Sequence, residues 1–187
     1  HDQSSAASDV YKRQTYTITY TATDTSNNSA SVDRVVNVIK SINLSVESLT
    51  GNWRIKREAG SLHLTSADTG EVWWSNSEID VLRRSCFFDD IYTFAQDGAF
   101  SQDMGLETWL EPFQGVDQEG CGTPVSPHNG NVANANYIVS DSQITVNGLG
   151  AFLGLAKATN GAELSSSAEA VSSITYDVLD FSNDGLN

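Results

Sequence analysis

Two adjacent tryptophans, Trp73 and Trp74, are the residues of this chain whose chemistry points most directly to a ligand. Successive side chains of a β-strand point to opposite faces, so one indole can join a core while the other reaches solvent. A solvent-facing indole can stack on the apolar CH face of a sugar while neighbouring polar groups bind the hydroxyls. The pair is therefore a candidate carbohydrate-binding surface.

A third tryptophan, Trp109, lies in a turn-rich segment among residues suited to the same task. Phe113 offers a second ring, while Glu111 and Gln114 offer a carboxylate and an amide that hydrogen-bond to hydroxyls. The sequence predicts that these four residues, with the tryptophan pair, form a carbohydrate-binding site. The alternative is that the tryptophans only fill a small core. Exposed rings would favour binding, and buried rings would favour the core.

Adjacent carboxylates at Asp89 and Asp90 are the second candidate for ligand chemistry. On a strand only one of them can point inward. Clustered carboxylates bind calcium, but no EF-hand spacing accompanies them. His128 has no partner His or Cys at metal-ligand spacing, and we interpret it as a loop histidine. The sequence predicts no metal site and no cofactor, with calcium kept as an alternative.

Residues 77–83, SEIDVLR, resemble the ExDxxE strand of family 16 glycoside hydrolases, in which two glutamates flank the scissile bond. Retaining hydrolysis needs two carboxyl groups about 5–5.5 Å apart. Glu78 holds the first position here, but Arg83 holds that of the second glutamate, and arginine cannot donate a proton at useful pH. No catalytic residue is predicted, although the parent polypeptide can still be a glycoside hydrolase.

The cysteine and charge content favours an extracellular protein. Cys86 and Cys121 are the only cysteines and lie in no CxxC or Cys/His cluster, which favours a disulfide over two free thiols. The net charge is −14, and from Cys86 onward Lys157 is the only basic residue apart from histidine. Such a field repels phosphate backbones and excludes nucleic acid as a partner. No apolar run reaches the roughly 20 residues of a membrane helix.

Apolar residues alternate with polar ones in short runs, which predicts an all-β protein. In 51–58, Trp53 and Ile55 alternate with Arg54 and Lys56. We expect seven or eight short strands in up-and-down order. The later ones lie at 86–94 and 99–103 around a turn at 96–98, at 136–140 and 143–147, at 148–155 as a strand or bulged segment, and at 173–181. Residues 162–173 are expected to form a loop or a single helical turn.

The first 48 residues divide into three parts. Residues 1–14 resemble a translated sequencing adaptor and are excluded from the fold. Residues 15–39 read as two strands around the turn DTSNNS, and they resemble the last two strands of a bacterial immunoglobulin-like domain of the HYR kind. Such domains are usually spacers or adhesion modules of secreted proteins. Residues 40–48 are predicted to be a linker.

Residues 49–187 carry the motifs TGNWRIKREAGSL, CFFDDIYTFAQDGAF, ETWLEPFQGV and GAFLGLAKA. Together these motifs resemble a lipocalin-like β module of secreted marine Bacteroidetes proteins, often found beside family 16 glycoside hydrolase domains. The resemblance implies a lipocalin-like antiparallel barrel or sandwich. Asn183-Asp184-Gly185, just before the last two residues, is a hairpin signal whose return strand is missing, so we expect the module to be truncated at its C-terminus.

These resemblances imply a secreted or cell-surface accessory module without catalytic activity. It would bind a polysaccharide such as a β-glucan beside covalently linked neighbouring domains, one of them a polysaccharide-degrading domain. A structural spacer or adhesion unit without a ligand is the alternative, and a fragment of a family 16-type hydrolase is a distant third.

Overall fold

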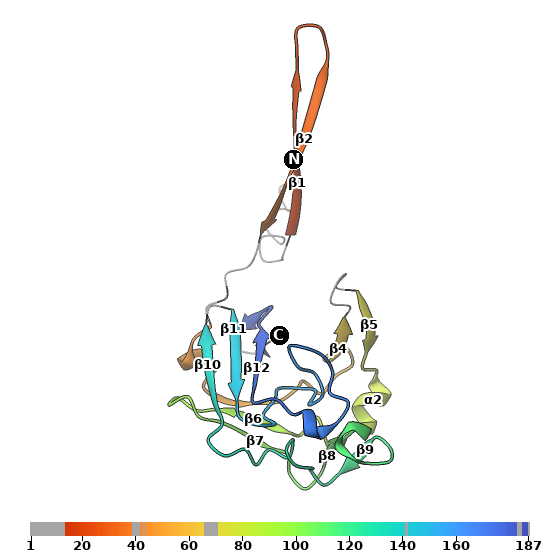
Figure 1. Ribbon diagram of the computed structural model, residues 1–187, viewed down its shortest axis with the longest axis vertical. Coiled ribbons are helices and arrows are strands. Elements are labelled where there is room, and N and C mark those ends of the chain that lie inside the picture. Colours follow the sequence, from red (N-terminus) through yellow and green to blue (C-terminus); the bar gives the residue numbers. More distant parts are fainter. Residues whose placement is uncertain are drawn as a thin grey trace, which may run out of the picture. The chain divides into compact units, whose positions relative to one another are not determined.

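A computed structural model of the chain describes a two-stranded hairpin and a separate compact unit, Leu44–Leu179 (Figure 1). The described residues are 14–38, 42, 44–65, 71–140, 142–182 and 185–186. The adaptor-like residues before Gln14 lie outside them, as do Asn183 and Asp184 of the expected turn.

The hairpin consists of β1 (Gln14–Thr23) and β2 (Ser29–Val38), which pair antiparallel as the alternation predicts. Its turn is held by Asp24, whose Oδ1 accepts hydrogen bonds from the backbone N–H groups of Ser26 and Asn28. Hydrogen bonds from Asn28 and Ser26 hold the pKa of Asp24 below its ordinary value. Local chemistry therefore determines where this hairpin turns.

The compact unit is built from short strands and four short helical turns. These elements are α1 (Val46–Leu49), β3 (Gly51–Trp53), β4 (His63–Thr65), β5 (Val72–Ser75), α2 (Glu78–Arg83), β6 (Ile91–Phe94), β7 (Phe100–Asp103), β8 (Thr108–Leu110), η1 (Pro112–Gln114), β9 (Gly120–Gly122), β10 (Asn136–Ser140), β11 (Gln143–Asn147), η2 (Ser167–Glu169) and β12 (Ser173–Asp177). Beyond it, β13 (Phe181–Ser182) and β14 (Gly185–Leu186) pair over two residues each. Segment 40–48, predicted to be a linker, thus contains most of α1.

All strand pairs are antiparallel, and the all-β prediction is confirmed. The sheets of the compact unit have the orders β3-β6-β7, β4-β5, β8-β9 and β10-β11-β12. The hairpin β10/β11 follows the predicted ranges, and β7 matches its range to within one residue (Figure 1). The strand expected over 86–94 is confirmed only from Ile91 onward, because residues 86–89 form a turn. The expected up-and-down order is wrong, because β3 pairs with β6 and not with β4, the next strand in the sequence. The described strands do not close into a barrel.

The core of the compact unit lies between its sheets. Phe94 is fully buried, and its ring contacts Phe100 on β7 and Tyr137 on β10, with centroids 5.3 and 4.9 Å apart. A second cluster joins α2 to β8 through Val81, Phe87, Phe88 and Trp109. The predicted disulfide, Cys86–Cys121, is confirmed and connects this cluster to β9. None of the helices among the described residues is long and apolar enough to cross a membrane.

Segment 148–155, expected to be a strand or a bulge, contains no strand. Its glycines instead allow close backbone approach. Gly150 has a φ of +79° and packs so tightly that a Cβ there would collide with the carbonyl oxygen of Pro127. Residues 162–173 hold the single turn η2, in line with the sequence.

Replacing Gly150 by alanine is expected to lower the free energy of unfolding by about 2–4 kcal/mol. The left-handed backbone costs a non-glycine residue about 1–2 kcal/mol, and the clash with Pro127 adds about 1–2 kcal/mol. Gly154→Ala is the matched control, because its φ is +70° and a Cβ would meet nothing within 4 Å. Urea unfolding should show a loss for Gly154→Ala of only about 1–2 kcal/mol, the backbone cost alone. Equal losses would contradict the close approach.

Candidate functional site

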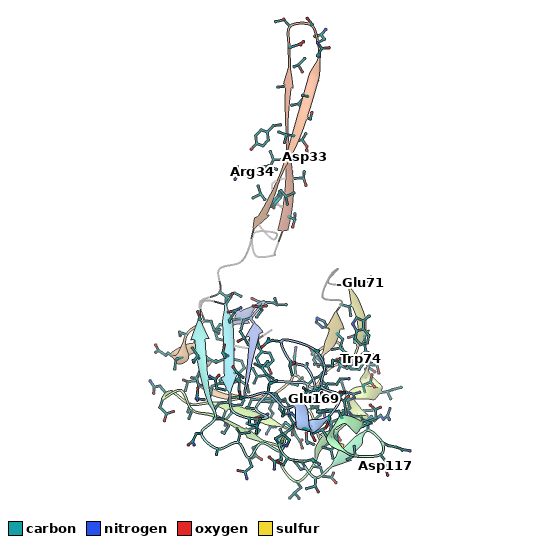
Figure 2. The ribbon with its side chains drawn as sticks, in the orientation of Figure 1. Asp33, Arg34, Glu71, Trp74, Asp117 and Glu169 are labelled. Atoms are coloured by element: carbon teal, nitrogen blue, oxygen red, sulfur yellow. A yellow bond between two sulfur atoms is a disulfide. The ribbon has the colours of Figure 1, made fainter. Side chains whose placement is uncertain are left out.

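The tryptophan pair lies on β5, immediately before α2, and Figure 2 labels Trp74. The Trp73 side chain is 64% exposed, whereas Trp74 is half-buried. The guanidinium of Arg84 lies 5.3 Å from the centroid of the Trp74 ring, a cation–π contact. Of the two neighbours, Trp73 is therefore the one available to a ligand.

A binding role would require an exposed ring at Trp109, but this ring is not exposed. It is only 7% exposed on β8. Arg84 lies 4.5 Å from its ring centroid and Arg83 lies 5.6 Å away. Glu119 approaches both arginines, with its oxygens 3.3 Å from Arg83 Nη2 and 3.8 Å from Arg84 Nη2. The ring is therefore packed against charged side chains of this chain, which leaves no face for a sugar.

The helix α2 explains why both arginines reach this position. Ser77 caps its N-terminus: the backbone N–H of Asp80 donates to the Ser77 hydroxyl, and Asp80 accepts from Ser77 in return. Arg83 is the last residue of the helix and Arg84 its C-cap, a position where the helix dipole favours a positive charge. Residues 77–83 thus form a helix where the hydrolase resemblance required a strand, so Glu78 lacks the strand setting of that motif.

Glu111, Phe113 and Gln114 are brought together with Trp109, as predicted, but around a very small cavity. The turn η1 is closed by Gln114, whose Oε1 accepts from the backbone N–H of Glu111 at 3.0 Å. The cavity is about 20 Å³ and is also lined by His128. Such a volume holds about one water molecule, so a sugar ring does not fit.

Lys157 neutralises part of the charge beside this cavity. Its Nζ lies 3.9 Å from Glu111 Oε2 and 3.5 Å from Glu163 Oε2. Burial raises the pKa of Glu111, while the charges of Lys157 and Arg84 oppose that shift. The carboxylate is therefore engaged within the fold.

Asp89 and Asp90 face opposite ways, with Asp89 exposed and Asp90 buried. The hydroxyl of Thr108 donates to Asp90 Oδ2 at 2.7 Å, and Oδ1 has no hydrogen-bond partner among the described residues. Burial raises the pKa of Asp90 to about 7, and the charges of Asp89 and Asp103 add to this. Within the described ranges, no three His, Cys, Asp or Glu side chains gather as metal ligands would.

His128 is a loop residue, as interpreted from the sequence, but it is buried. Its ring lies between Phe113 and Phe152, with centroids 5.6 and 6.0 Å away. Burial lowers its pKa, so the imidazole stays neutral near pH 7. No sequence pattern indicates this burial or that of Asp90, because both depend on contacts between distant segments.

No protein-family model matches the chain, and neither a curated protein nor a solved structure matches it. A function therefore has to be inferred from the residues and their arrangement.

Proposed function

We propose that the chain is a non-catalytic accessory region of a secreted multidomain protein and that it binds a polysaccharide through Trp73. The observation that carries this proposal is the 64% exposure of the Trp73 side chain on a strand. Large aromatic rings are usually buried, and exposed ones are frequent at binding surfaces. A flat indole face suits the apolar face of a pyranose ring.

Other exposed apolar side chains lie close to Trp73 in the sequence. Ile79 and Leu82 are 74% and 72% exposed on the following helix, whereas Val72, 53% exposed, precedes Trp73 on β5 and points to the opposite face of the strand. Ile79 and Leu82 are three residues apart and so share one face of α2. An extended polymer could contact this strand and helix together, which favours a polysaccharide over a small sugar.

The backbone that carries Trp73 is held in place from beneath. Trp74 packs on Arg84, which packs on Trp109. Asn76, just after β5, is buried: its Oδ1 accepts from the backbone N–H of Leu62 at 2.8 Å, and its Nδ2 donates to the carbonyl of Glu58 at 2.9 Å. A side chain presented from a rigid backbone loses less entropy when it binds.

An accessory role is consistent with weak binding by a single exposed ring. Linked to a polysaccharide-degrading domain, such a surface keeps the enzyme near its substrate by effective concentration. The lipocalin-like and immunoglobulin-like resemblances support this context, with a β-glucan as the partner. The disulfide is in keeping with an extracellular module.

A structural spacer is the second candidate function. The buried ring of Trp109 and the water-sized cavity beside it favour this alternative, because four of the six residues predicted to contact sugar line that cavity: Trp109, Glu111, Phe113 and Gln114.

Binding of soluble β-glucan, followed by calorimetry and tryptophan fluorescence, tests the proposal. We expect saturable binding that Trp73→Ala weakens at least tenfold, because loss of a stacked ring removes about 1.4 kcal/mol or more. Leu106→Ala is the matched control, since it removes apolar surface from a side chain that is 90% exposed outside β5 and α2. Flat titrations with β-glucan, alginate and agar-type oligosaccharides would contradict the proposal and leave the spacer.

A further inference from the structure

Strand β1 of the hairpin has a neighbouring strand on one side only. It pairs with β2 in a two-stranded sheet, and none of the other described strands joins that sheet. Residues 15–23 of β1 are exposed along their whole length. The open edge of a strand presents a row of backbone N–H and C=O groups to which another strand can bond. Because two strands alone are only marginally stable in water, further strands would stabilise this sheet.

The register of the hairpin determines which backbone groups face the open edge. The backbone N–H of Asp24 donates to the carbonyl of Asn28 at 2.9 Å, and these two residues lie opposite each other, next to the last pair of the ladder. Hydrogen-bonded pairs alternate with non-hydrogen-bonded pairs along an antiparallel ladder. Counting back from Asp24, the even-numbered residues of β1 therefore bond to β2. The odd-numbered residues direct their backbone groups to the open edge, and all of those from 15 to 23 are threonines.

The sequence along this edge is the same in both directions. Residues 15–21 read TYTITYT, a palindrome centred on Ile18. When two copies of β1 pair antiparallel about a two-fold axis at Ile18, every residue lies opposite one of the same type. Tyr16 then lies opposite Tyr20 of the other copy, and threonines lie opposite threonines as the hydrogen-bonded pairs. Aromatic pairs and threonine pairs are among those that stabilise antiparallel sheets, so the edge of β1 is complementary to itself.

The distribution of charge favours the edge of β1 over that of β2. Strand β1 has no charged residue, whereas Asp33 and Arg34, labelled in Figure 2, lie in the middle of β2. Charged side chains on an edge strand oppose its pairing with another chain. Arg34 lies opposite Ile18, so two copies paired through β1 would hold their Arg34 residues in one row with both Ile18 residues between them. Three strand spacings separate these charges by about 14 Å, more than the screening length of about 8–10 Å.

We propose that the chain self-associates through β1, and that two copies join their hairpins into one four-stranded antiparallel sheet of order β2-β1-β1-β2. Each copy contributes the same residues to the contact, as a closed two-fold dimer requires. The interface lies in the hairpin, so it forms whether or not Trp73 binds a polysaccharide. The dimer would carry two Trp73 surfaces, and weak binding of each to one polymer would gain avidity.

Sedimentation equilibrium of the full chain tests this proposal. We expect the average mass to rise with concentration from 20.2 kDa towards twice that value. Thr17→Pro should weaken the dimer about tenfold, because the change removes one backbone N–H from each copy and so two hydrogen bonds across the two-fold axis. Val35→Pro is the matched control, since Val35 lies opposite Thr17 and its N–H faces the outer edge of β2. This control should leave the dimer in place.

An introduced cysteine tests the register independently of these proline variants. The two native cysteines are bonded to each other, so Ile18→Cys adds the only free thiol. Across the two-fold axis the Cα atoms of residue 18 would lie about 4.5 Å apart, within the range of a disulfide. Mild oxidation should therefore yield a covalent dimer, whereas Val32→Cys, exposed on β2, should crosslink far less.

Three results would each overturn the proposal. The first is an unchanged chain that keeps a mass of 20.2 kDa up to about 1 mM. The second is an equal effect of Thr17→Pro and Val35→Pro on the dimer. The third is equal crosslinking of the two cysteine variants.

Discussion

Asp90→Asn is expected to stabilise the protein at pH 8 by about 2–4 kcal/mol and to have little effect near pH 4. Asp90 has an ordinary pKa of 3.8 in the unfolded chain and about 7 when buried in the fold. The folded state therefore holds the proton more tightly, and the contribution of Asp90 to stability decreases as pH rises from about 4 to about 7. Three pH units correspond to at most about 4 kcal/mol.

The neutral amide of the variant avoids this cost and still accepts from Thr108. Urea unfolding of both proteins between pH 4 and 8 measures the difference. Asp89→Asn, which changes an exposed neighbour, should alter the free energy of unfolding by an amount that varies little with pH. Groups with lowered pKa values, such as Asp80 and Glu169, affect both proteins equally and cancel. A difference for Asp90→Asn that is the same at every pH would contradict the burial of a charged carboxylate.

Removal of the disulfide by the double change Cys86→Ala and Cys121→Ala is expected to cost about 3–4 kcal/mol of unfolding free energy. The bond joins residues 35 apart, and in the chain-entropy model closing such a loop restricts the unfolded chain by about this amount. Cys86 is also buried in the cluster with Phe87, Phe88 and Trp109, so its loss leaves some contacts unmade.

Denaturant unfolding at one pH measures this loss, and the unchanged protein in reducing buffer provides the control. The double variant and the reduced protein should lose a similar unfolding free energy if the bond itself is responsible. Unfolding free energies within about 1 kcal/mol of the oxidised protein would show that the loop is already restricted in the unfolded state.

The parts of the fold that were predicted from the sequence are local. The hairpins β6/β7 and β10/β11 have alternating strands, and a turn signal, Asp97-Gly98, lies between the first two. The pairing of β3 with β6 was missed, because it joins Gly51 to Phe94 across two other strands. Periodicity specifies that a strand exists but does not identify its partner.

The helix α2 was missed for a different reason. Ser77 followed three residues later by Asp80 is a capping signal that the sequence contains, but the resemblance to a hydrolase strand took precedence over it. For the site, strand alternation correctly separated Trp73 from Trp74 on β5. Asp89 and Asp90 also differ in burial, but they precede β6 and do not lie on the expected strand. The burial of Trp109 was not predictable, since it depends on Arg84 from another element packing on its ring.

The disulfide also has a mechanical consequence for a module held between covalent neighbours. A pulling force applied at Leu44 and Leu179 would pass through the Cys86–Cys121 bond and bypass the residues between them. At about 3.5 Å per extended residue, the 35-residue loop would withhold about 120 Å of contour length. Strands β6, β7 and β8, with the turn η1, lie inside this loop, so they carry no tension as long as the bond is intact. The part of the chain that holds Trp73 lies outside the loop and would bear the tension.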